Sequence, residues 1–277
     1  MSSPSRTARD AIGPDAPDIA LVAKQPPIAN LSDFFALFAY YLRAPDTFWY
    51  RGHASFRWGL TPSALRYPTR QKRQLALDVI ADFRRLVHAR FRDGFPAPST
   101  EFQWMMLAQH YGLPTRILDW TESLTVALYF ACFENDDDDG LVIALNPVDL
   151  NNRYDKAAGR ILDPHKDDKL IGEYAGLKAS QRRTGKPTVA VNPIWNTERI
   201  RLQRGAFTLH GNRAFMLDRS QVDSLFCVQI PAESKATLRR ELHGIGVDRM
   251  SLFPEPEHVA WHLKALHGLE PGSGPNV

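Results

Sequence analysis

The stretch at residues 101–134 constrains the fold of this chain more than any other part of the sequence. Its sequence is EFQWMMLAQHYGLPTRILDWTESLTVALYFACFE. It predicts a helix, a polar turn containing Gly112 and Pro114, a short strand and a second helix. Such a corner brings a His, an Arg, an Asp and two hydroxyl groups close together. A connection with only a structural role would not need these groups at one place.

The composition indicates a globular protein with an ample core, because 44% of its 277 residues are hydrophobic and 23% are charged. A net charge of +3 is too weak to imply nucleic-acid binding. The two cysteines, Cys132 and Cys227, supply neither a disulfide framework nor a zinc site. No apolar run reaches the roughly 18 residues of a membrane span, and the N-terminus lacks a signal-peptide pattern. We therefore expect a cytoplasmic protein without membrane contact.

The rest of the chain predicts one domain between two tails. Residues 1–29 are expected to be a disordered tail, residues 30–268 the domain, and residues 269–277 a flexible C-terminal tail. Helices are expected after an N-cap at Ser32 and at residues 71–92, 168–179, 235–242 and 256–267. Strands are expected at residues 47–50, 141–145, 188–191 and 224–230. This order favours an α+β fold over a regular parallel sheet.

Several familiar motifs are missing from the sequence. It contains no GxxxxGK[ST] loop, no GxGxxG, no HExxH and no GxSxG. These absences argue against ATP hydrolysis, dinucleotide-linked redox chemistry and zinc proteolysis. The acidic run at residues 136–139 predicts an exposed turn, since it lacks the spacing of a calcium loop. No metal is expected.

Arg51 and Gly52 follow the aromatic strand at residues 47–50. A guanidinium group can bind a phosphate through two parallel hydrogen bonds, and a glycine lets a ligand approach the main chain. Alternatively, Arg51 pairs with a buried acid, for example Asp119. The residues alone favour these two interpretations equally.

Three side chains of the corner have both a functional and a structural interpretation. His110 is a candidate base or ligand contact, or a satisfied histidine at a helix end. Arg116 follows a Pro-Thr turn and is expected to bind loop carbonyls. Asp119 lies in an apolar strand, where an unpaired charge is costly, so we expect it to have a partner.

The residues after Asp119 also allow two interpretations. Trp120 and Tyr129 are expected in the core, but either is able to line a pocket that binds a ring. Thr121 and Ser123 precede a helix and are able to cap it. Exposed hydroxyl groups at a helix N-terminus also suit an anion.

Several of these segments together resemble the FRG domain family: Tyr50-Arg51-Gly52, QHYGLPTRILDWTESLTVALYFA at 109–131, RIRLQRGAF at 199–207 and SLFP at 251–254. The resemblance extends from about residue 31 to residue 266. His53 stands where the family more often has Gln. The FRG pattern is in turn similar to that of ADP-ribosyltransferases, whose split sheet holds NAD. The resemblance implies a single α+β domain with a split antiparallel or mixed β-sheet core flanked by helices.

The resemblance also implies site roles, with NAD as a substrate rather than a bound cofactor. Arg51, between Tyr50 and Gly52, would fix the phosphate and ribose of NAD. Gln203 lies where the transferases place a catalytic Glu, so Asp119 is the first candidate for the acid, ahead of Glu101, Glu122, Glu255 and Glu257. The other implied site residues are His110, Arg116, Thr121, Ser123, Tyr129 and Arg201.

Three functional hypotheses follow. The first is an NAD-using transferase that modifies a macromolecular acceptor, protein or nucleic acid, as a toxin or a phage-defence effector. The second is a non-catalytic module that binds a nucleotide or a nucleic-acid end through Arg51, Arg116 and Arg201. The third is an interaction scaffold, which predicts that the segments around Arg51, Asp119 and Gln203 lie far apart.

Overall fold

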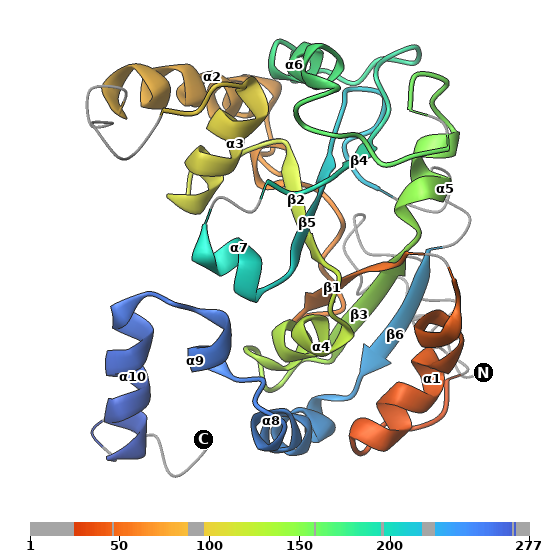
Figure 1. Cartoon of the computed structure of the whole chain (residues 1–277), viewed down its shortest axis with the longest axis vertical. Coiled ribbons are helices and arrows are strands. Elements are labelled where there is room, and N and C mark those ends of the chain that lie inside the picture. The colour runs from red at the N-terminus through yellow and green to blue at the C-terminus, as the bar shows by residue number, and fades with distance from the viewer. Residues whose placement is uncertain are drawn as a thin grey trace, which may run out of the picture.

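The computed structural model describes residues 25–45, 47–87, 97–157, 159–194, 197–217, 225–267 and 269. It has an α+β fold, with one six-stranded sheet flanked by helices (Figure 1). Every pair of named strands is antiparallel, which confirms the predicted α+β class and antiparallel sheet. The strand order is β4-β5-β2-β1-β3-β6. The strands are β1 (Trp49–His53), β2 (Ile117–Thr121), β3 (Gly140–Leu145), β4 (Val189–Val191), β5 (Gly205–Leu209) and β6 (Phe226–Ile230).

The middle of the sheet is its narrowest connection. Strand β1 pairs with β3 along its whole length, and β2 pairs with β5 in the same way. Between β1 and β2, however, the described residues form a single registered pair, Tyr50 with Thr121. The sheet therefore consists of two halves, β4-β5-β2 and β1-β3-β6, that meet at one point. We call this boundary the seam.

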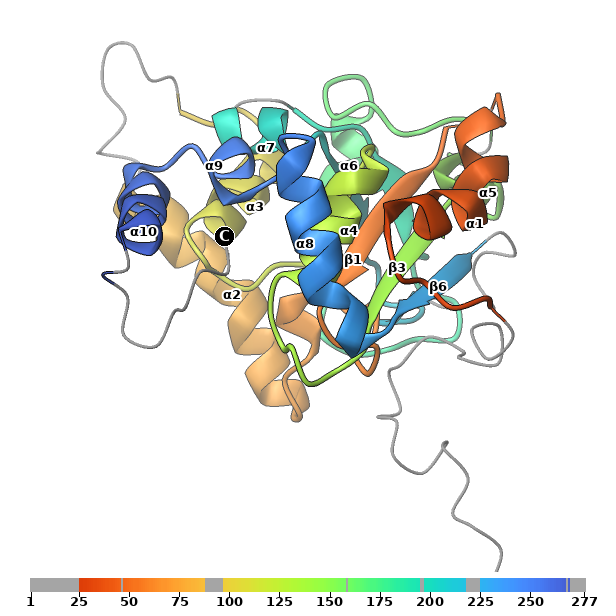
Figure 2. The same ribbon diagram turned by 90° about the horizontal axis from the view of Figure 1, so that it is seen from below.

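Three helices cover the β1-β3-β6 half of the sheet: α1 (Leu31–Arg43), α4 (Leu124–Cys132) and α8 (Lys235–Gly244) (Figure 2). Helix α4 crosses β1 and β3 at unusually short range, because two glycines lie beneath it. A Cβ atom added to Gly52 would lie 1.9 Å from the Ala127 carbonyl oxygen, and one at Gly140 would lie 2.4 Å from that of Ala131. These glycines set the distance between the helix and the sheet.

The other described helices are α2 (Arg70–Val87), α3 (Glu101–His110), α5 (Pro147–Asn152), α6 (Asp168–Ala175), α7 (Glu198–Leu202), α9 (Arg249–Leu252) and α10 (Pro256–Leu266). Helix α9 contributes Leu252 to the core of the β1-β3-β6 half, and α10 packs against α9. Two short 3-10 helices lie at Ser63–Leu65 and Ala232–Ser234. Within the described residues, no helix is both long enough and apolar enough to span a membrane.

The start of the domain differs from the prediction. Helix α1 begins at Leu31, and its N-cap is Asn30 rather than Ser32, because the Asn30 side chain accepts a hydrogen bond from the Asp33 amide at 3.0 Å. The ordered chain also begins before the predicted boundary at residue 30. Gln25 exchanges two hydrogen bonds with the main chain of Gln229, and Ile28 is buried in the core.

Other element boundaries were also shifted or missed. Helix α6 ends at Ala175, four residues before the predicted end, and helix α5 was not predicted. Helix α5 begins after Asn146, whose side chain accepts from two main-chain amides, and it has a proline in its first turn. The predicted tails at residues 1–24 and 270–277 and the end of the predicted helix at residues 88–92 lie outside the described residues.

Candidate functional site

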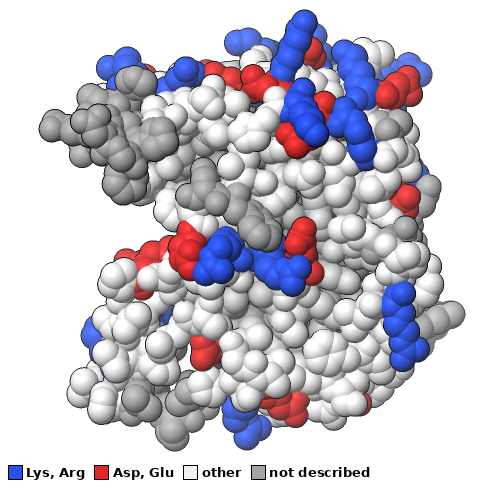
Figure 3. All heavy atoms as spheres, in the orientation of Figure 1, with Lys and Arg blue, Asp and Glu red and all other residues white. Residues whose placement is uncertain are grey.

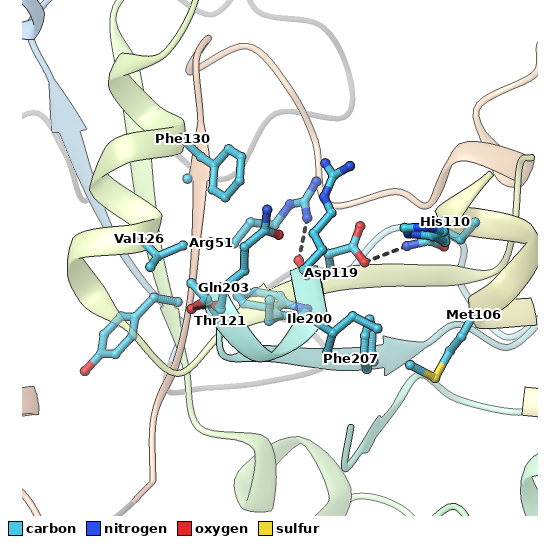
Figure 4. A pocket seen from close by; sticks show the side chains of 15 residues that line it. Arg51, Met106, His110, Asp119, Thr121, Val126, Phe130, Ile200, Gln203 and Phe207 are labelled. Carbon is cyan, nitrogen blue, oxygen red and sulfur yellow. Dashed lines mark hydrogen bonds between the residues drawn. The ribbon is translucent and has the colours of Figure 1, made fainter. Parts of the chain in front are cut away.

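A cavity of about 300 Å³ lies at the seam (Figure 4). This volume is at the lower end of the range for small-molecule sites. Its walls come from β1, β2 and β5 and from helices α3, α4 and α7. Its polar lining includes Arg51, Gln109, His110, Asp119, Arg199 and Gln203, and an apolar wall is formed by Met106, Val126, Phe130, Ile200 and Phe207.

The molecule is indented on one side. Figure 3 shows an indentation at the left edge, above the part that carries α10 in Figure 1. His110 ends α3 and Arg199 belongs to α7, and both side chains line the cavity.

Arg51 comes from β1 and closes the seam with its side chain. Its Nη1 donates a hydrogen bond to the main-chain carbonyl of Asp119, and its Nε donates to His53 Nε2 at 2.9 Å. Burial lowers the pKa of Arg51 to about 10, while the nearby Asp119 carboxylate partly restores it. The guanidinium is therefore charged at neutral pH. The expected pairing of Arg51 with Asp119 exists, but the hydrogen bond is to the carbonyl and not to the carboxylate.

His53 serves as the acceptor that orients Arg51. Burial lowers its pKa well below the usual range, and Arg51 and Arg66 lower it further. The ring is therefore neutral, and Nε2 is free to accept the hydrogen bond from Arg51.

Asp119 directs its carboxylate into the pocket from the middle of β2. Its neighbours Leu118 and Trp120 are buried in the core, as the alternation of a strand requires. The carboxylate oxygen Oδ1 accepts a hydrogen bond from Gln109 Nε2 at 2.6 Å. The pKa of Asp119 is raised by burial in the protein, against the opposing effects of Arg51, Gln109 and Arg199. The pocket thus admits solvent to a carboxylate that it also partly desolvates.

The end of helix α3 places Gln109 and His110 at the pocket. The helix stops because Gly112 adopts a left-handed conformation, with φ of 82°. The Leu113 amide then donates to the Ala108 carbonyl at 2.9 Å, which closes the last turn. The exposed ring of His110 lies on the pocket wall, with its centroid 5.2 Å from that of Tyr111.

Gln203 lines the pocket, but its amide is used to hold neighbouring elements. The side-chain Nε2 of Gln203 donates a hydrogen bond to the main-chain carbonyl of Leu252 in α9 at 3.1 Å. The main-chain carbonyl of Gln203 accepts one from the Thr121 hydroxyl at 2.7 Å. An amide also has no acidic proton to give. The proposed catalytic role of Gln203 therefore has less support than its structural role between α7, β2 and α9.

Four of the predicted ligand-binding residues do not line the pocket. Arg116 is fully buried, and its guanidinium donates to the carbonyls of Leu177, Lys178, His210 and Gly211 at 2.6–3.5 Å. This confirms that Arg116 binds loop carbonyls, and it removes the residue from the ligand site. Burial lowers its pKa to about 10.

The other three predicted residues that do not line the pocket are Tyr129, Ser123 and Arg201. The Tyr129 ring is buried against the ring of Phe133, 5.1 Å away, and does not line the pocket. Ser123 caps α4 by accepting from the Val126 amide. Arg201 is exposed and pairs with Glu198 one turn away. Each of these side chains is engaged by local structure rather than by the pocket.

Thr121, Tyr50 and Gly52 contact the pocket in a different way from that predicted. The Thr121 hydroxyl donates a hydrogen bond to the main-chain carbonyl of Gln203 and accepts one from the Ser123 amide at 3.0 Å. Its proton is therefore already used within the protein. The Tyr50 ring is buried against Phe38 with 6.0 Å between centroids. Gly52 is required by the approach of α4 described above. These residues shape the pocket more than they bind a ligand.

Gln109 and Arg199 were missed by the sequence analysis as pocket residues. Arg199 lies one helical turn before Gln203 in α7, so the two share a face, whereas Arg201 faces away. Its guanidinium stacks on the Phe253 ring, 4.7 Å from the centroid, and lies 3.8 Å from the Glu255 carboxylate. The i, i+4 spacing would have found Arg199 if the segment had been assigned to a helix.

The charges in the pocket favour an anionic ligand. Of the described residues that line it, Asp119 is the one carboxylate, while Arg51 and Arg199 supply two guanidinium groups. Figure 4 shows Asp119 between Arg51 and His110. The described residues include no cluster of three or more His, Cys, Asp or Glu side chains that could hold a metal ion.

The fold and the pocket together define an α+β protein with an Arg- and Asp-containing ligand pocket at the seam of an antiparallel sheet. The model of the FRG domain family matches residues 46–140 of this chain. The match includes β1, α2, α3, β2 and α4 but not α7. It is shorter than the resemblance expected from the sequence, which extended from about residue 31 to residue 266. No curated protein and no solved structure matches the chain.

Proposed function

We propose that the pocket binds NAD and cleaves its nicotinamide–ribose bond, transferring ADP-ribose to a macromolecular acceptor. The observation that carries this proposal is that Asp119, the one carboxylate among the described lining residues, faces a cavity that also holds two guanidinium groups. A divided antiparallel sheet with a pocket at the division fits the split sheet that the resemblance to ADP-ribosyltransferases implies, and it supports this proposal. We further propose that the protein acts in the cytoplasm as a toxin or a phage-defence effector.

The chemistry of the reaction matches these groups. Cleavage of the nicotinamide–ribose bond passes through an oxocarbenium-like state with positive charge on the ribose. A carboxylate that faces this charge lowers the barrier, as it does in glycosidases. Asp119 is the group in this position in our proposal, because the Gln203 amide carries no charge and is bound to Leu252. The leaving nicotinamide departs as a neutral ring, so no proton donor is needed for it.

The other pocket residues have binding roles in this proposal. Arg51 and Arg199 bind the pyrophosphate, since a guanidinium holds phosphate oxygens through charged hydrogen bonds. The apolar wall of Val126, Phe130 and Phe207 receives the rings of the dinucleotide. His110 lies at the rim on the side of α3, where it contacts the nicotinamide end or the acceptor.

The two alternative hypotheses have less support. A nucleic-acid module that uses Arg51, Arg116 and Arg201 would need all three side chains at one surface. Arg116 is buried and Arg201 is paired with Glu198 outside the pocket. The scaffold hypothesis required the three segments to lie apart. That expectation is wrong, because Arg51, Asp119 and Gln203 all line the same cavity.

The test compares the wild-type protein with Asp119→Asn, which keeps the shape of the side chain and removes its charge. We expect wild-type protein to release nicotinamide from NAD and Asp119→Asn to do so roughly 100-fold or more slowly. Binding of NAD, followed by calorimetry, should change only a few-fold in the variant. Asp82→Asn is the matched control, since Asp82 is exposed on α2 far along the chain from the pocket residues.

The proposal is refuted by a wild-type protein that neither binds nor consumes NAD. If that protein instead binds single-stranded RNA or DNA with an affinity that falls steeply with salt, the module hypothesis replaces it. An Asp119→Asn variant with undiminished nicotinamide release would reject Asp119 as the carboxylate while leaving NAD as the substrate.

A further inference from the structure

A chain of three hydrogen bonds leads from the main chain of β2 to the Asp119 carboxylate. The Ile117 amide donates to Thr115 Oγ1 at 3.1 Å. The Thr115 hydroxyl donates to Gln109 Oε1, and Gln109 Nε2 donates to Asp119 Oδ1 at 2.6 Å. All four residues lie between the last turn of α3 and the middle of β2. The turn between them, which the sequence singled out, therefore connects α3 to the carboxylate.

The donor and acceptor roles in this chain follow from its first member together with the ionised form of Asp119. A main-chain amide can only donate, so Thr115 Oγ1 must accept from Ile117. The single hydroxyl proton of Thr115 is then available for Gln109, whose amide oxygen accepts it. The Gln109 amide is left with its NH2 group toward Asp119. The opposite amide orientation would place two oxygen acceptors together unless Asp119 were protonated.

This arrangement also gives the two oxygens of the Asp119 carboxylate different surroundings. Oδ1 is occupied by Gln109, and Figure 4 shows this bond as a dashed line to the Asp119 carboxylate. Because Gln109 fixes Oδ1, rotation of the carboxyl group about its own axis is restricted, and Oδ2 is directed to the cavity. A lone carboxylate at the same position would be free to rotate toward either guanidinium group.

We propose that Gln109 is the positioning residue for Asp119, and that Thr115 fixes the Gln109 amide so that it holds the carboxylate in its ionised form. As a statement about catalysis this inference rests on the proposed function, because Asp119 is the reacting carboxylate only there. As a statement about the carboxylate itself it stands on the three hydrogen bonds.

The other charged or titratable groups that face Asp119 come from three elements. Arg51 of β1 and Arg199 of α7 both favour the ionised carboxylate, and burial opposes it. His110, at the end of α3, lines the same pocket. Removing the Gln109 amide leaves these groups in place, so the effect of Gln109 can be measured against a constant background.

The test is the titration of Asp119 by NMR of carboxyl-13C-labelled aspartate, with the signal assigned by its loss in Asp119→Asn. Gln109→Leu should raise the pKa of Asp119 by about one pH unit, because a hydrogen bond to a charged group is lost at a partly solvent-exposed site. Gln71→Leu, at an exposed position on α2, is the matched control and should leave the pKa unchanged.

Thr115 supplies a second pair of variants. Thr115→Val keeps the shape of the side chain but cannot donate to Gln109, so it should raise the pKa of Asp119 in the same direction by a smaller amount. Thr115→Ser keeps the hydroxyl and should restore the wild-type titration. Because Thr115→Val also removes the acceptor of the Ile117 amide, Thr115→Val is compared with Thr115→Ser by the Asp119 titration in folded protein and not by stability. The same shift should appear in the acidic limb of nicotinamide release.

The possible outcomes separate this inference from the proposed function. A folded Gln109→Leu variant with an unchanged Asp119 titration refutes the positioning role, whether or not NAD is consumed. A raised pKa in a protein that does not consume NAD supports the positioning role and rejects the transferase. If Gln109→Leu does not fold, the difference between Thr115→Val and Thr115→Ser decides the question.

Discussion

Replacement of Gly52 by alanine tests how closely helix α4 lies on the sheet. The added Cβ would lie 1.9 Å from the Ala127 carbonyl oxygen and 2.7 Å from the Ala131 amide nitrogen. Both atoms belong to the main chain of α4, so no side-chain rotation can relieve the contact. An ordinary contact begins near 3.4 Å, and the helix would have to retreat from β1 by about 1.5 Å.

The cost of this retreat should be large. Overpacking a well-packed core costs up to about 3 kcal/mol, and more when the main chain must move. We therefore expect Gly52→Ala to lower the free energy of unfolding by about 3 kcal/mol or more. For a chain of this size, that loss corresponds to a decrease in Tm of about 6–12 °C. The pocket should widen as well, because α4 carries Val126 and Phe130 while β1 carries Arg51.

The assay is guanidinium unfolding followed by tryptophan fluorescence and circular dichroism, together with thermal unfolding. Gly172→Ala is the matched control, because Gly172 lies in helix α6 with no atom within 4 Å of the added Cβ. There alanine should stabilise the protein by up to about 1 kcal/mol through its better helix propensity. If Gly52→Ala unfolds at the same denaturant concentration as the wild-type protein, the close contact of α4 with β1 is refuted.

Three further predictions concern two buried polar groups, Arg116 and His210, and the pocket residue Asp119. Arg116→Met should lower the free energy of unfolding by about 3 kcal/mol or more, measured by guanidinium titration, because four main-chain carbonyls lose their donor. His210 is buried with its pKa lowered to about 3, so the unfolded state takes up a proton first as the pH falls below about 6.5. The contribution of neutral, buried His210 to the free energy of unfolding is therefore complete above pH 6.5 and should fall by about 2 kcal/mol at pH 5. His210→Gln should make the free energy of unfolding depend less steeply on pH between these two values, as measured by unfolding experiments at each pH. Because burial raises the pKa of Asp119, its ionised form opposes folding, so Asp119→Asn should raise the Tm at neutral pH and not at a pH low enough to protonate Asp119.

The parts of the fold that the sequence predicted well are those defined by local patterns. The order of helix, turn, strand and helix at residues 101–134 follows from apolar spacing and from Gly112, and the structure has this order. Asp119 was recognised as a strand residue in need of partners, and it has one in Gln109. Both inferences needed only residues close together in the sequence.

The parts that the sequence did not predict depend on contacts between distant segments. Helix α7 has five residues, too few for a periodic pattern, and its orientation is fixed by Gln203 and α9. Arg199 therefore could not be chosen over Arg201 without a helix assignment. Gly52 was interpreted as a place for ligand approach, because no local signal indicates that α4 lies on it.

The single main-chain pair at the seam gives Arg51 two competing partners. In most of the sheet, ladder hydrogen bonds join the strands, and a ligand does not compete for them. At the seam, the Asp119 carbonyl is held by the same guanidinium that faces the cavity. An anion that draws this guanidinium to itself weakens a contact between the two halves of the sheet. Ligand occupancy and the separation of β1 from β2 are thus thermodynamically linked, and a bound anion favours whichever separation lets Arg51 bind it more tightly.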